Sequence, residues 1–282
     1  MDIVILVWFF LLGTIFGSFF NVVIYRFNTG KSLGGRSHCL SCGKTLSWYE
    51  LLPVVSYLAQ QGKCRHCHAH ITSRYLVIEL LTGALFLLVA QTFLFDPVLL
   101  LLNLVIVSLL VIIVMYDLRH MIIPDALVLF LLAPAVAYTL WDPLMQVLVF
   151  PPIMALFGAL IPAVLFAGLW LVSRGAWIGL GDAKLAVPLG LIVGAWGSIS
   201  MFVLSFWIGA VVAVGLLLLQ RIFTTLKRHR GGQLFLRFLR RPLTIKSEVP
   251  FAPFLVAAFL LVHFAHTDAF LLVESVRVWL FG

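Results

Sequence analysis

Two aspartates border long apolar runs of this sequence. Asp117 lies in "MYDLRHMIIPD", where one run ends, and Asp182 lies in "GLGDAKL", where another begins. Ionisable groups at membrane depth are costly and mark functional sites by default. Two carboxylates in one dry cleft share a proton, so one can deprotonate a water molecule while the other protonates a scissile carbonyl. The pair therefore predicts aspartic proteolysis, with Asp117 and Asp182 as the catalytic residues.

Each acid also has a purely structural explanation. Asp182 alone fits the N-cap of a helix after a glycine-rich turn, and Asp117 alone fits a carboxylate at a helix end. Asp125 is the competing partner, but the proline before it predicts the first turn of a helix, where an acid suits the helix dipole. Glu79 is expected to pair with basic loop residues. The placement of Asp117 and Asp182 at one membrane face favours these two.

The four cysteines form two CxxC pairs, Cys39 with Cys42 and Cys64 with Cys67, separated by 21 residues. Each pair can present two thiolates to one ion, so the pattern predicts a zinc site. Four thiolates leave no open coordination position, which makes the expected zinc structural. Unligated thiols or a redox pair are the alternative. Four nearby histidines are expected to be mostly solvated: His38, His66, His68 and His70.

The elements that position these residues are predicted to be membrane spans. The chain has 282 residues, of which 63% are hydrophobic and 11% charged, whereas soluble domains carry about 25% charged residues. Apolar runs of about 20 residues predict an all-α polytopic membrane protein with eight transmembrane helices, the sixth of them short. The first run is expected to be a retained span and not a signal peptide. The predicted spans are 3–25, 75–94, 98–116, 123–141, 147–172, 183–197, 199–220 and 251–273.

The basic residues predict the orientation of these spans. Of the 19 lysines and arginines, only Arg277 falls on the opposite side in an eight-span count. Cytoplasmic loops of membrane proteins are enriched in lysine and arginine, so both termini should face outward. The net charge of +8 is thus mainly a topology signal, with contact to anionic lipids of the bilayer as a secondary effect. Nucleic-acid binding is not expected, because the basic residues form no separate domain.

The chain divides into three predicted segments. Residues 1–26 form the first transmembrane helix, 27–74 form a small cytoplasmic zinc-binding loop domain (the cysteine loop), and 75–282 form a seven-helix domain with a basic cytoplasmic loop at 221–248. No internal repeat is apparent. Within the first helix, Gly13, Gly17 and Asn21 recur every four residues, which predicts a close-packed helix face.

Other hydrolase signatures are missing from the sequence. It contains no Gly-x-Ser-x-Gly stretch and no His-Glu-x-x-His helix, so serine and zinc hydrolases have little support. It also lacks a Walker loop, which argues against energy-driven transport.

The motifs resemble those of one family. "GLGDAKL" is similar to the GxGD motif of type IV prepilin leader peptidases, and "GSFFNVVIYR" (17–26) to that family's first-span signature. The two CxxC pairs, "SRYLVIELLTG", "YDLRHMIIPD" and the late "VPFAPF" resemble its other blocks in the expected order.

The resemblance implies a bifunctional enzyme. It assigns the catalytic aspartates to Asp117 and Asp182 and matches the four cysteines to the family's zinc ligands. It implies cleavage after glycine of type IV prepilins or type II secretion pseudopilins, at the cytoplasmic face of the bacterial inner membrane. It also implies N-methylation of the new terminus with S-adenosylmethionine, for which composition and spacing indicate no binding site. The alternatives are a presenilin-like intramembrane protease and a non-enzymatic, zinc-stapled membrane scaffold or transporter.

Overall fold

The computed structural model describes residues 3–27, 29, 32, 34–145, 151–227 and 249–269. Within these ranges the protein is all-α, with eight α-helices and one short 3-10 helix. The fold class is thus all-α, as the composition predicts. The chain forms two compact units, the first made of Met1–Arg119 with Ile123–Val149 and the second of His120–Ile122 with Phe150–Gly282.

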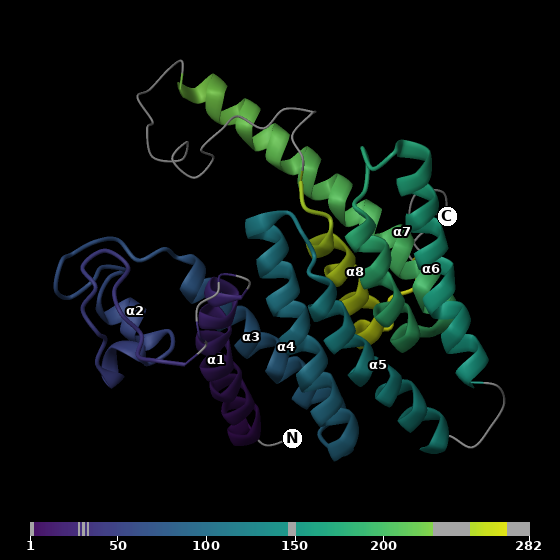
Figure 1. Ribbon diagram of the computed structural model, residues 1–282, viewed down its shortest axis with the longest axis horizontal. Coiled ribbons are helices and arrows are strands. Elements are labelled where there is room, and N and C mark those ends of the chain that lie inside the picture. Colours follow the sequence, from purple (N-terminus) through teal and green to yellow (C-terminus); the bar gives the residue numbers. More distant parts are fainter. Residues whose placement is uncertain are drawn as a thin grey trace, which may run out of the picture. The chain divides into compact units, whose positions relative to one another are not determined.

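Helices α1 (Ile3–Arg26) and α3 (Arg74–Phe93) lie side by side in the first unit (Figure 1). A Cβ built on Gly13 would lie 2.7 Å from the carbonyl oxygen of Thr82, and one built on Gly17 would lie 2.8 Å from the Cα of Glu79. Asn21 continues this face by donating its amide to the carbonyl oxygen of Tyr75 at 3.4 Å. The predicted close-packed face of the first helix is therefore confirmed.

Helices α4 (Pro97–His120) and α5 (Asp125–Met145) complete the helices of the first unit. The start of α4 is set by Asp96, whose Oδ1 accepts hydrogen bonds from the backbone N–H groups of Leu99 and Val98 at 3.0 Å. These bonds, together with one from Trp141, lower the pKa of Asp96 below its usual range. Because Asp96 begins α4, it fixes the helix that carries Asp117 near its other end.

The cysteine loop contains the 3-10 helix η1 (Trp48–Leu51) and α2 (Val55–Ala59). The backbone hydrogen bonds around Cys39 recur around Cys64, 25 residues later. The N–H of Cys39 donates to Lys44 and that of Cys64 to Ala69, both at 2.9 Å. The two CxxC turns thus share one backbone hydrogen-bond pattern, although the sequence around them does not repeat beyond the cysteines.

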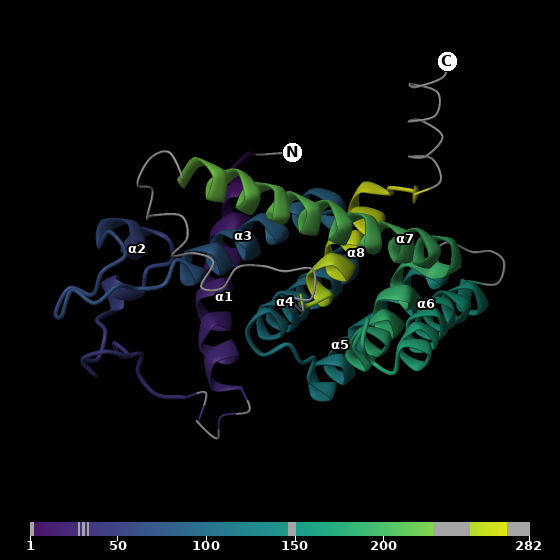
Figure 2. The ribbon, with the colours of Figure 1, turned by 90° about the horizontal axis from the view of Figure 1, so that it is seen from above.

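The second unit contains α6 (Pro151–Ser173), α7 (Leu180–Lys227) and α8 (Ala252–Ala265). Helices α6 and α7 lie against each other (Figure 2). At their closest approach, a Cβ on Gly190 would collide with the carbonyl oxygen of Gly158 and lie 2.7 Å from its carbonyl carbon. Two glycines thus allow this contact.

Helix α7 holds both the sixth and the seventh predicted span. Its two parts meet at Gly194, whose φ of 70° and ψ of −176° are not helical. The predicted break, between residues 197 and 199, lies a few residues too late. A positive φ favours glycine, and of the two glycines available, Gly194 adopts it while Gly197 remains helical.

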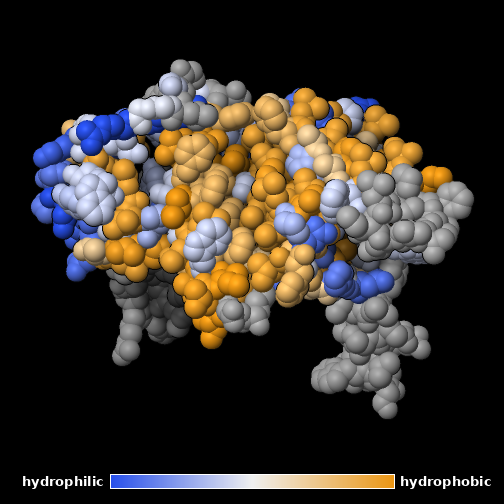
Figure 3. All heavy atoms as spheres, turned by 90° about the horizontal axis from the view of Figure 1, so that it is seen from below, coloured by the Kyte–Doolittle hydropathy of each residue, from blue (hydrophilic) through white to orange (hydrophobic). Residues whose placement is uncertain are grey.

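Five helices of the described residues are long and apolar enough to cross a membrane: Ile3–Arg26, Arg74–Phe93, Pro97–His120, Ile153–Ser173 and Leu180–Arg221. The shorter apolar helix Asp125–Trp141 coincides with the predicted span 123–141. Helix Ala252–Ala265 begins one residue after the start of the last predicted span but ends eight residues before its predicted end at 273. The helix composition is that of a multi-pass membrane protein. In Figure 3, hydrophilic side chains gather over the cysteine loop and hydrophobic ones cover the neighbouring helices. Most of the predicted basic loop, residues 228–248, lies outside the described residues.

Candidate functional site

Asp117 lies in the last turns of α4 in the first unit, where its side chain is only 5% exposed. Asp182 lies in the first turn of α7 in the second unit and is 6% exposed. One oxygen of each carboxylate, Oδ2 of Asp117 and Oδ1 of Asp182, is fully buried. Asp125, the competing acid, is exposed in the first turn of α5. The two predicted catalytic residues are therefore buried, whereas the competing Asp125 is exposed.

The glycine-rich turn before Asp182 leaves room beside its carboxylate. The N–H of Asp182 donates to the carbonyl oxygen of Gly179 at 3.2 Å. A Cβ built on Gly179 would lie 3.4 Å from Asp182 Oδ2. Because α7 begins at Leu180, Asp182 lies inside the first turn and is not the N-cap residue. The simple N-cap explanation for this acid is therefore wrong.

The four cysteines come together in the cysteine loop. Their Sγ atoms all lie within 4.8 Å of one another, and those of Cys39 and Cys67 are 3.8 Å apart. Metal–sulfur bonds of about 2.3 Å in a tetrahedron place neighbouring sulfurs about 3.8 Å apart. The cluster thus has the spacing of a four-thiolate metal site.

The backbone of the loop favours ionised sulfur at one of these positions. The N–H groups of Cys42 and Ser41 lower the pKa of the Cys39 thiol from 9.0 to about 6. The N–H of Ala69 also lowers the pKa of Cys67, but desolvation and the three neighbouring thiols together raise it to about 11. Such close thiolates repel one another unless a cation joins them, so the chemistry of the donor set fits a metal.

The chain turns sharply after each CxxC pair. Gly43 and His68, which follow the second cysteine of each pair, have φ values of 71° and 55°. Their N–H groups donate back to the carbonyl oxygens of Cys39 and Cys64 at 2.9 Å. A histidine tolerates this conformation better than most residues, which gives His68 a structural role. His66 lies 3.2 Å from Lys44 through its Nδ1 and is not among the clustered ligands.

Glu79 in α3 is buried and joins the cysteine loop to this helix. Its Oε2 accepts a hydrogen bond from the N–H of Val54 at 2.7 Å. Val54 has a φ of 62°, a conformation that a β-branched residue adopts only under external constraint. The expectation that Glu79 pairs with basic loop residues is replaced by this bond to the backbone. Glu79 is a positioning residue of the loop.

Glu50 is a second buried acid, for which the sequence predicts no role in the site. Its Oε2 accepts from the N–H of Ser47 at 2.8 Å in a capping box at the start of η1. Its other oxygen, Oε1, is buried and has no hydrogen-bond partner in the described part of the chain. The S-x-x-E pattern of "SWYE" is the signal that could have indicated its place at a helix start.

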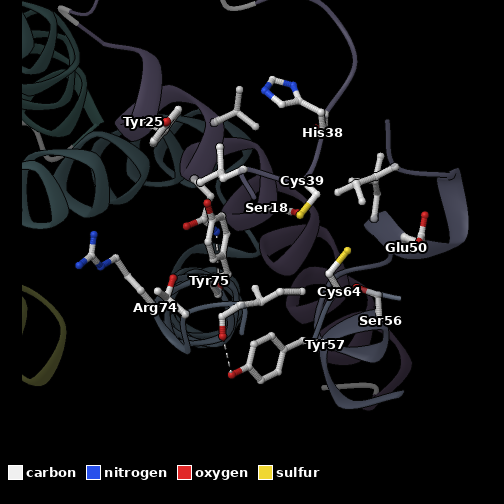
Figure 4. A pocket seen from close by; sticks show the side chains of 18 of the residues that line it. Ser18, Tyr25, His38, Cys39, Glu50, Ser56, Tyr57, Cys64, Arg74 and Tyr75 are labelled. Atoms are coloured by element: carbon white, nitrogen blue, oxygen red, sulfur yellow. Dashed lines mark hydrogen bonds between the residues drawn. The ribbon is translucent and has the colours of Figure 1, made fainter. Parts of the chain in front are cut away.

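A cavity of about 910 Å³ lies between the cysteine loop and the adjoining ends of α1 and α3. Figure 4 shows side chains from all three elements around it, with Cys39 and Cys64 on one side and Tyr75 on the other. We call it the loop cavity. Its lining includes Ser18, Tyr25, Glu50, Ser56, Tyr75 and Glu79.

Comparison with known protein families identifies both parts of the chain. Residues 11–93 match the bacterial peptidase A24 N-terminal domain. Residues 104–214, which include Asp117 and Asp182, match the type IV leader peptidase family. The cysteine loop and α3 thus fall in the first match, and α4 to most of α7 fall in the second.

Several curated proteins are similar to the chain over most of its length. A prepilin leader peptidase/N-methyltransferase from Myxococcus xanthus is 35% identical over 219 residues, which are 75% of this chain and 63% of that protein. The protein of the same name from Bacillus subtilis is 32% identical over 76% of this chain and 84% of its own length. No solved structure matches the chain. The identity and coverage, together with the two family matches, establish that the chain belongs to the peptidase A24 family of type IV prepilin leader peptidases/N-methyltransferases.

Proposed function

We propose that this chain is a membrane aspartic endopeptidase that cleaves the leader of type IV prepilins or type II secretion pseudopilins after glycine. Asp117 and Asp182 are the catalytic pair. The observation that carries the proposal is that both acids are buried at helix ends within the segment that matches the leader peptidase family. The scaffold or transporter alternative offers no reason to bury carboxylates at these two positions.

The positions of the acids in their helices suggest their roles. Asp182 lies in the first turn of α7, where the helix dipole stabilises a negative charge, whereas Asp117 lies near the end of α4, where it does not. Asp182 therefore takes a proton from water as the water oxygen bonds to the scissile carbonyl carbon, and Asp117 donates a proton to the carbonyl oxygen. The C–N bond then breaks as the leaving amine receives the proton held by Asp182, and one hydroxyl of the tetrahedral intermediate returns its proton to Asp117, so that the product has a free carboxyl group.

The four cysteines bind a structural zinc ion in this proposal. The 3.8 Å separation of the Cys39 and Cys67 sulfurs supports this, since it equals the edge of a zinc–thiolate tetrahedron. Zinc supplies folding energy to a loop with few apolar core residues and offers no open position for catalysis.

The remaining parts of the proposal concern the membrane and the second reaction. Eight spans cross the bacterial inner membrane with the cysteine loop and both aspartates toward the cytoplasm, in line with the distribution of basic residues. After cleavage, the new terminus of the substrate is N-methylated with S-adenosylmethionine as the donor, as the names of the relatives indicate for those proteins.

The peptidase proposal is tested with Asp117→Asn and Asp182→Asn in the full-length enzyme, purified in detergent and supplied with a prepilin. Loss of one general acid or base lowers a rate by about 10²–10⁴-fold, so both variants should leave the leader attached. Asp125→Asn is the matched control, because Asp125 is an exposed carboxylate at a helix start. Its cleavage rate should equal that of the parent. Cleavage at the parent rate by either Asp117→Asn or Asp182→Asn would overturn the assignment.

The same assay distinguishes the proposed leader peptidase from the presenilin-like intramembrane protease. A prepilin and an unrelated single-span membrane protein are supplied at equal concentration. A leader peptidase releases the leader and leaves the second protein intact, whereas comparable cleavage of both substrates would favour a general intramembrane protease.

A further inference from the structure

The cysteine loop exposes large apolar side chains on η1 and α2. Trp48 is 76% exposed, and Val55 and Leu58 are each 61% exposed. None of them lines the loop cavity, whereas Ser56 and Tyr57 of α2 do. The two short helices thus turn hydroxyl-bearing side chains toward the cavity and leave an apolar surface outside it. We call this surface the η1–α2 face, and its members are Trp48, Leu52, Val55 and Leu58.

The members of this face lie close together. Val55 and Leu58 are three residues apart in α2, so their side chains are neighbours on that helix. Trp48 begins η1 and Leu52 caps its end, and η1 packs against α2. Single exposed apolar side chains are common, but a group of them marks contact with a membrane or with another protein.

A hydrogen bond fixes the position of the η1–α2 face along α3. Val54, between η1 and α2, donates its N–H to Oε2 of Glu79 at 2.7 Å. Helix α3 begins at Arg74, five residues before Glu79, which at 1.5 Å per residue is a distance of about 7.5 Å along the helix. In Figures 1 and 2, α2 accordingly lies beside α1 and not beyond its end.

This position corresponds to the boundary of a bilayer. Helices α1 and α3 are both long and apolar enough to cross a membrane, and a basic residue such as Arg74 at the end of a span anchors it at the headgroups. Amphipathic segments that lie on a membrane bury their apolar side by about 5–10 Å at the boundary of headgroups and acyl chains. The bond between Val54 and Glu79 holds the η1–α2 face in this range.

The charges of the cysteine loop favour an anionic surface. Residues 27–74 contain six lysines and arginines and one acid, Glu50. Because Glu50 is buried, the loop has no exposed acid to repel anionic headgroups. Basic residues close to an anionic bilayer are attracted to it within a Debye length.

Aromatic and basic side chains meet at the edge of the face. The ring of Trp48 lies 5.8 Å from that of Tyr49, and Cζ of Arg65 lies 5.3 Å from the centroid of the Tyr49 ring. Tryptophan and tyrosine are enriched where proteins meet the membrane interface. A guanidinium group binds a phosphate oxygen pair, while the apolar stem of the side chain covers neighbouring apolar surface. This set of groups suits a phospholipid headgroup.

We infer that the η1–α2 face docks on the anionic surface of the bilayer that α1 and α3 cross. Its apolar side chains lie at the ends of the acyl chains, and Arg65 lies at the phosphate groups. The contact holds the cysteine loop against the membrane through a surface of its own, in addition to its two covalent links to α1 and α3. The inference requires only that these helices span the membrane, so failure of the peptidase proposal leaves it unaffected.

A protein is the competing occupant of this face. A second copy of the chain would bring the same basic residues to the contact, where like charges repel. An acidic partner would match the charge, but it would have to displace lipid at the level of Glu79. A lipid surface meets both conditions, since it is anionic and already surrounds the spans.

Photo-cross-linking tests the occupant in the full-length protein. Leu58→p-benzoylphenylalanine is reconstituted in nanodiscs of phosphatidylcholine and phosphatidylglycerol, and its adducts are identified by mass spectrometry after irradiation. Leu40→p-benzoylphenylalanine is the matched control, because Leu40 is a leucine of the same loop with the same 61% exposure but lines the loop cavity. Lipid adducts should form several-fold more at position 58 than at position 40. The thermal midpoint shows that both variants are folded.

Hydrogen–deuterium exchange tests the contact without a photoreactive group. Amides of residues 48–60 should exchange more slowly in discs that contain phosphatidylglycerol than in discs of phosphatidylcholine alone. Leu58→Glu should remove this difference, because a carboxylate is repelled by the anionic surface, whereas Leu40→Glu should retain it. Equal lipid adducts at the two positions, adducts to a protein at position 58, or no effect of the lipid on exchange in the parent would overturn the inference.

Discussion

At the scale of single residues, the described part of the chain buries four carboxylates, and their surroundings divide them into two kinds. Glu50 and Glu79 each accept a backbone N–H, from Ser47 and from Val54. These bonds fix the shape of the cysteine loop and its contact with α3. Asp117 and Asp182 lie at the ends of long apolar helices, where a charged group is costly and needs a functional reason.

The cysteine cluster leads to a prediction at this scale. Cys67→Ser should lower the zinc content of the purified protein from about one ion per chain to a small fraction, because a closed four-thiolate site loses one ligand. His66→Ala should retain the full zinc content, since His66 is not among the clustered ligands. Zinc is measured by inductively coupled plasma mass spectrometry after gel filtration. Full zinc content in Cys67→Ser would contradict a site made of these four sulfurs.

The sequence indicated the two acids that the structure buries at helix ends and the four cysteines that it brings together, but not the role of Glu50 or the hydrogen-bond partner of Glu79. Asp117, Asp182 and the cysteines lie in local patterns whose spacing alone carries the chemistry. By contrast, Glu79 binds a residue 25 positions earlier in the chain, and the burial of Glu50 depends on how the loop folds. Side chains whose partners are set by tertiary contacts carry no local signal, which is why the loop cavity also went unpredicted.

At the scale of elements, glycines decide how α6 and α7 meet. Hydrophobic burial does not drive helices together within lipid, so close backbone packing at small residues takes its place. Gly158 and Gly190 form such a contact, and Gly194 ends the first part of α7 next to it. The hydropathy pattern predicted that spans exist here. It misplaced their boundary because hydropathy does not report which glycine has a positive φ.

This contact predicts a difference between two glycine substitutions. Gly190→Ala should destabilise the protein by about 1–3 kcal/mol or more, because the added Cβ collides with backbone that cannot move independently. Gly168→Ala, in the interior of α6 with nothing within 4 Å of the added Cβ, should be neutral or stabilise by up to about 1 kcal/mol. The apparent thermal midpoints in detergent compare them. Equal midpoints for Gly190→Ala and the parent would contradict the contact.

At the scale of the whole molecule, the orientation of the spans determines whether the two aspartates can act together. They belong to different compact units, so their common action requires that the ends of α4 and α6 and the start of α7 face the same compartment. Arg119 follows Asp117, and Arg174 and Lys184 flank Asp182. Because cytoplasmic loops collect such basic residues, the chain should place all of these groups on the cytoplasmic side.

Reporter fusions test this orientation. Alkaline phosphatase is active only outside the cytoplasm, and green fluorescent protein fluoresces when fused on the cytoplasmic side. Fusion after Phe93, at the end of α3, should give phosphatase activity, whereas fusions after His120 and Ser173 should fluoresce, since α4 and α6 end on the basic side. The Phe93 and His120 fusions serve as opposite controls for each other. Phosphatase activity after Ser173 would put Asp182 and Asp117 on opposite sides of the bilayer, where they could not share a proton, and the peptidase proposal would fail with it.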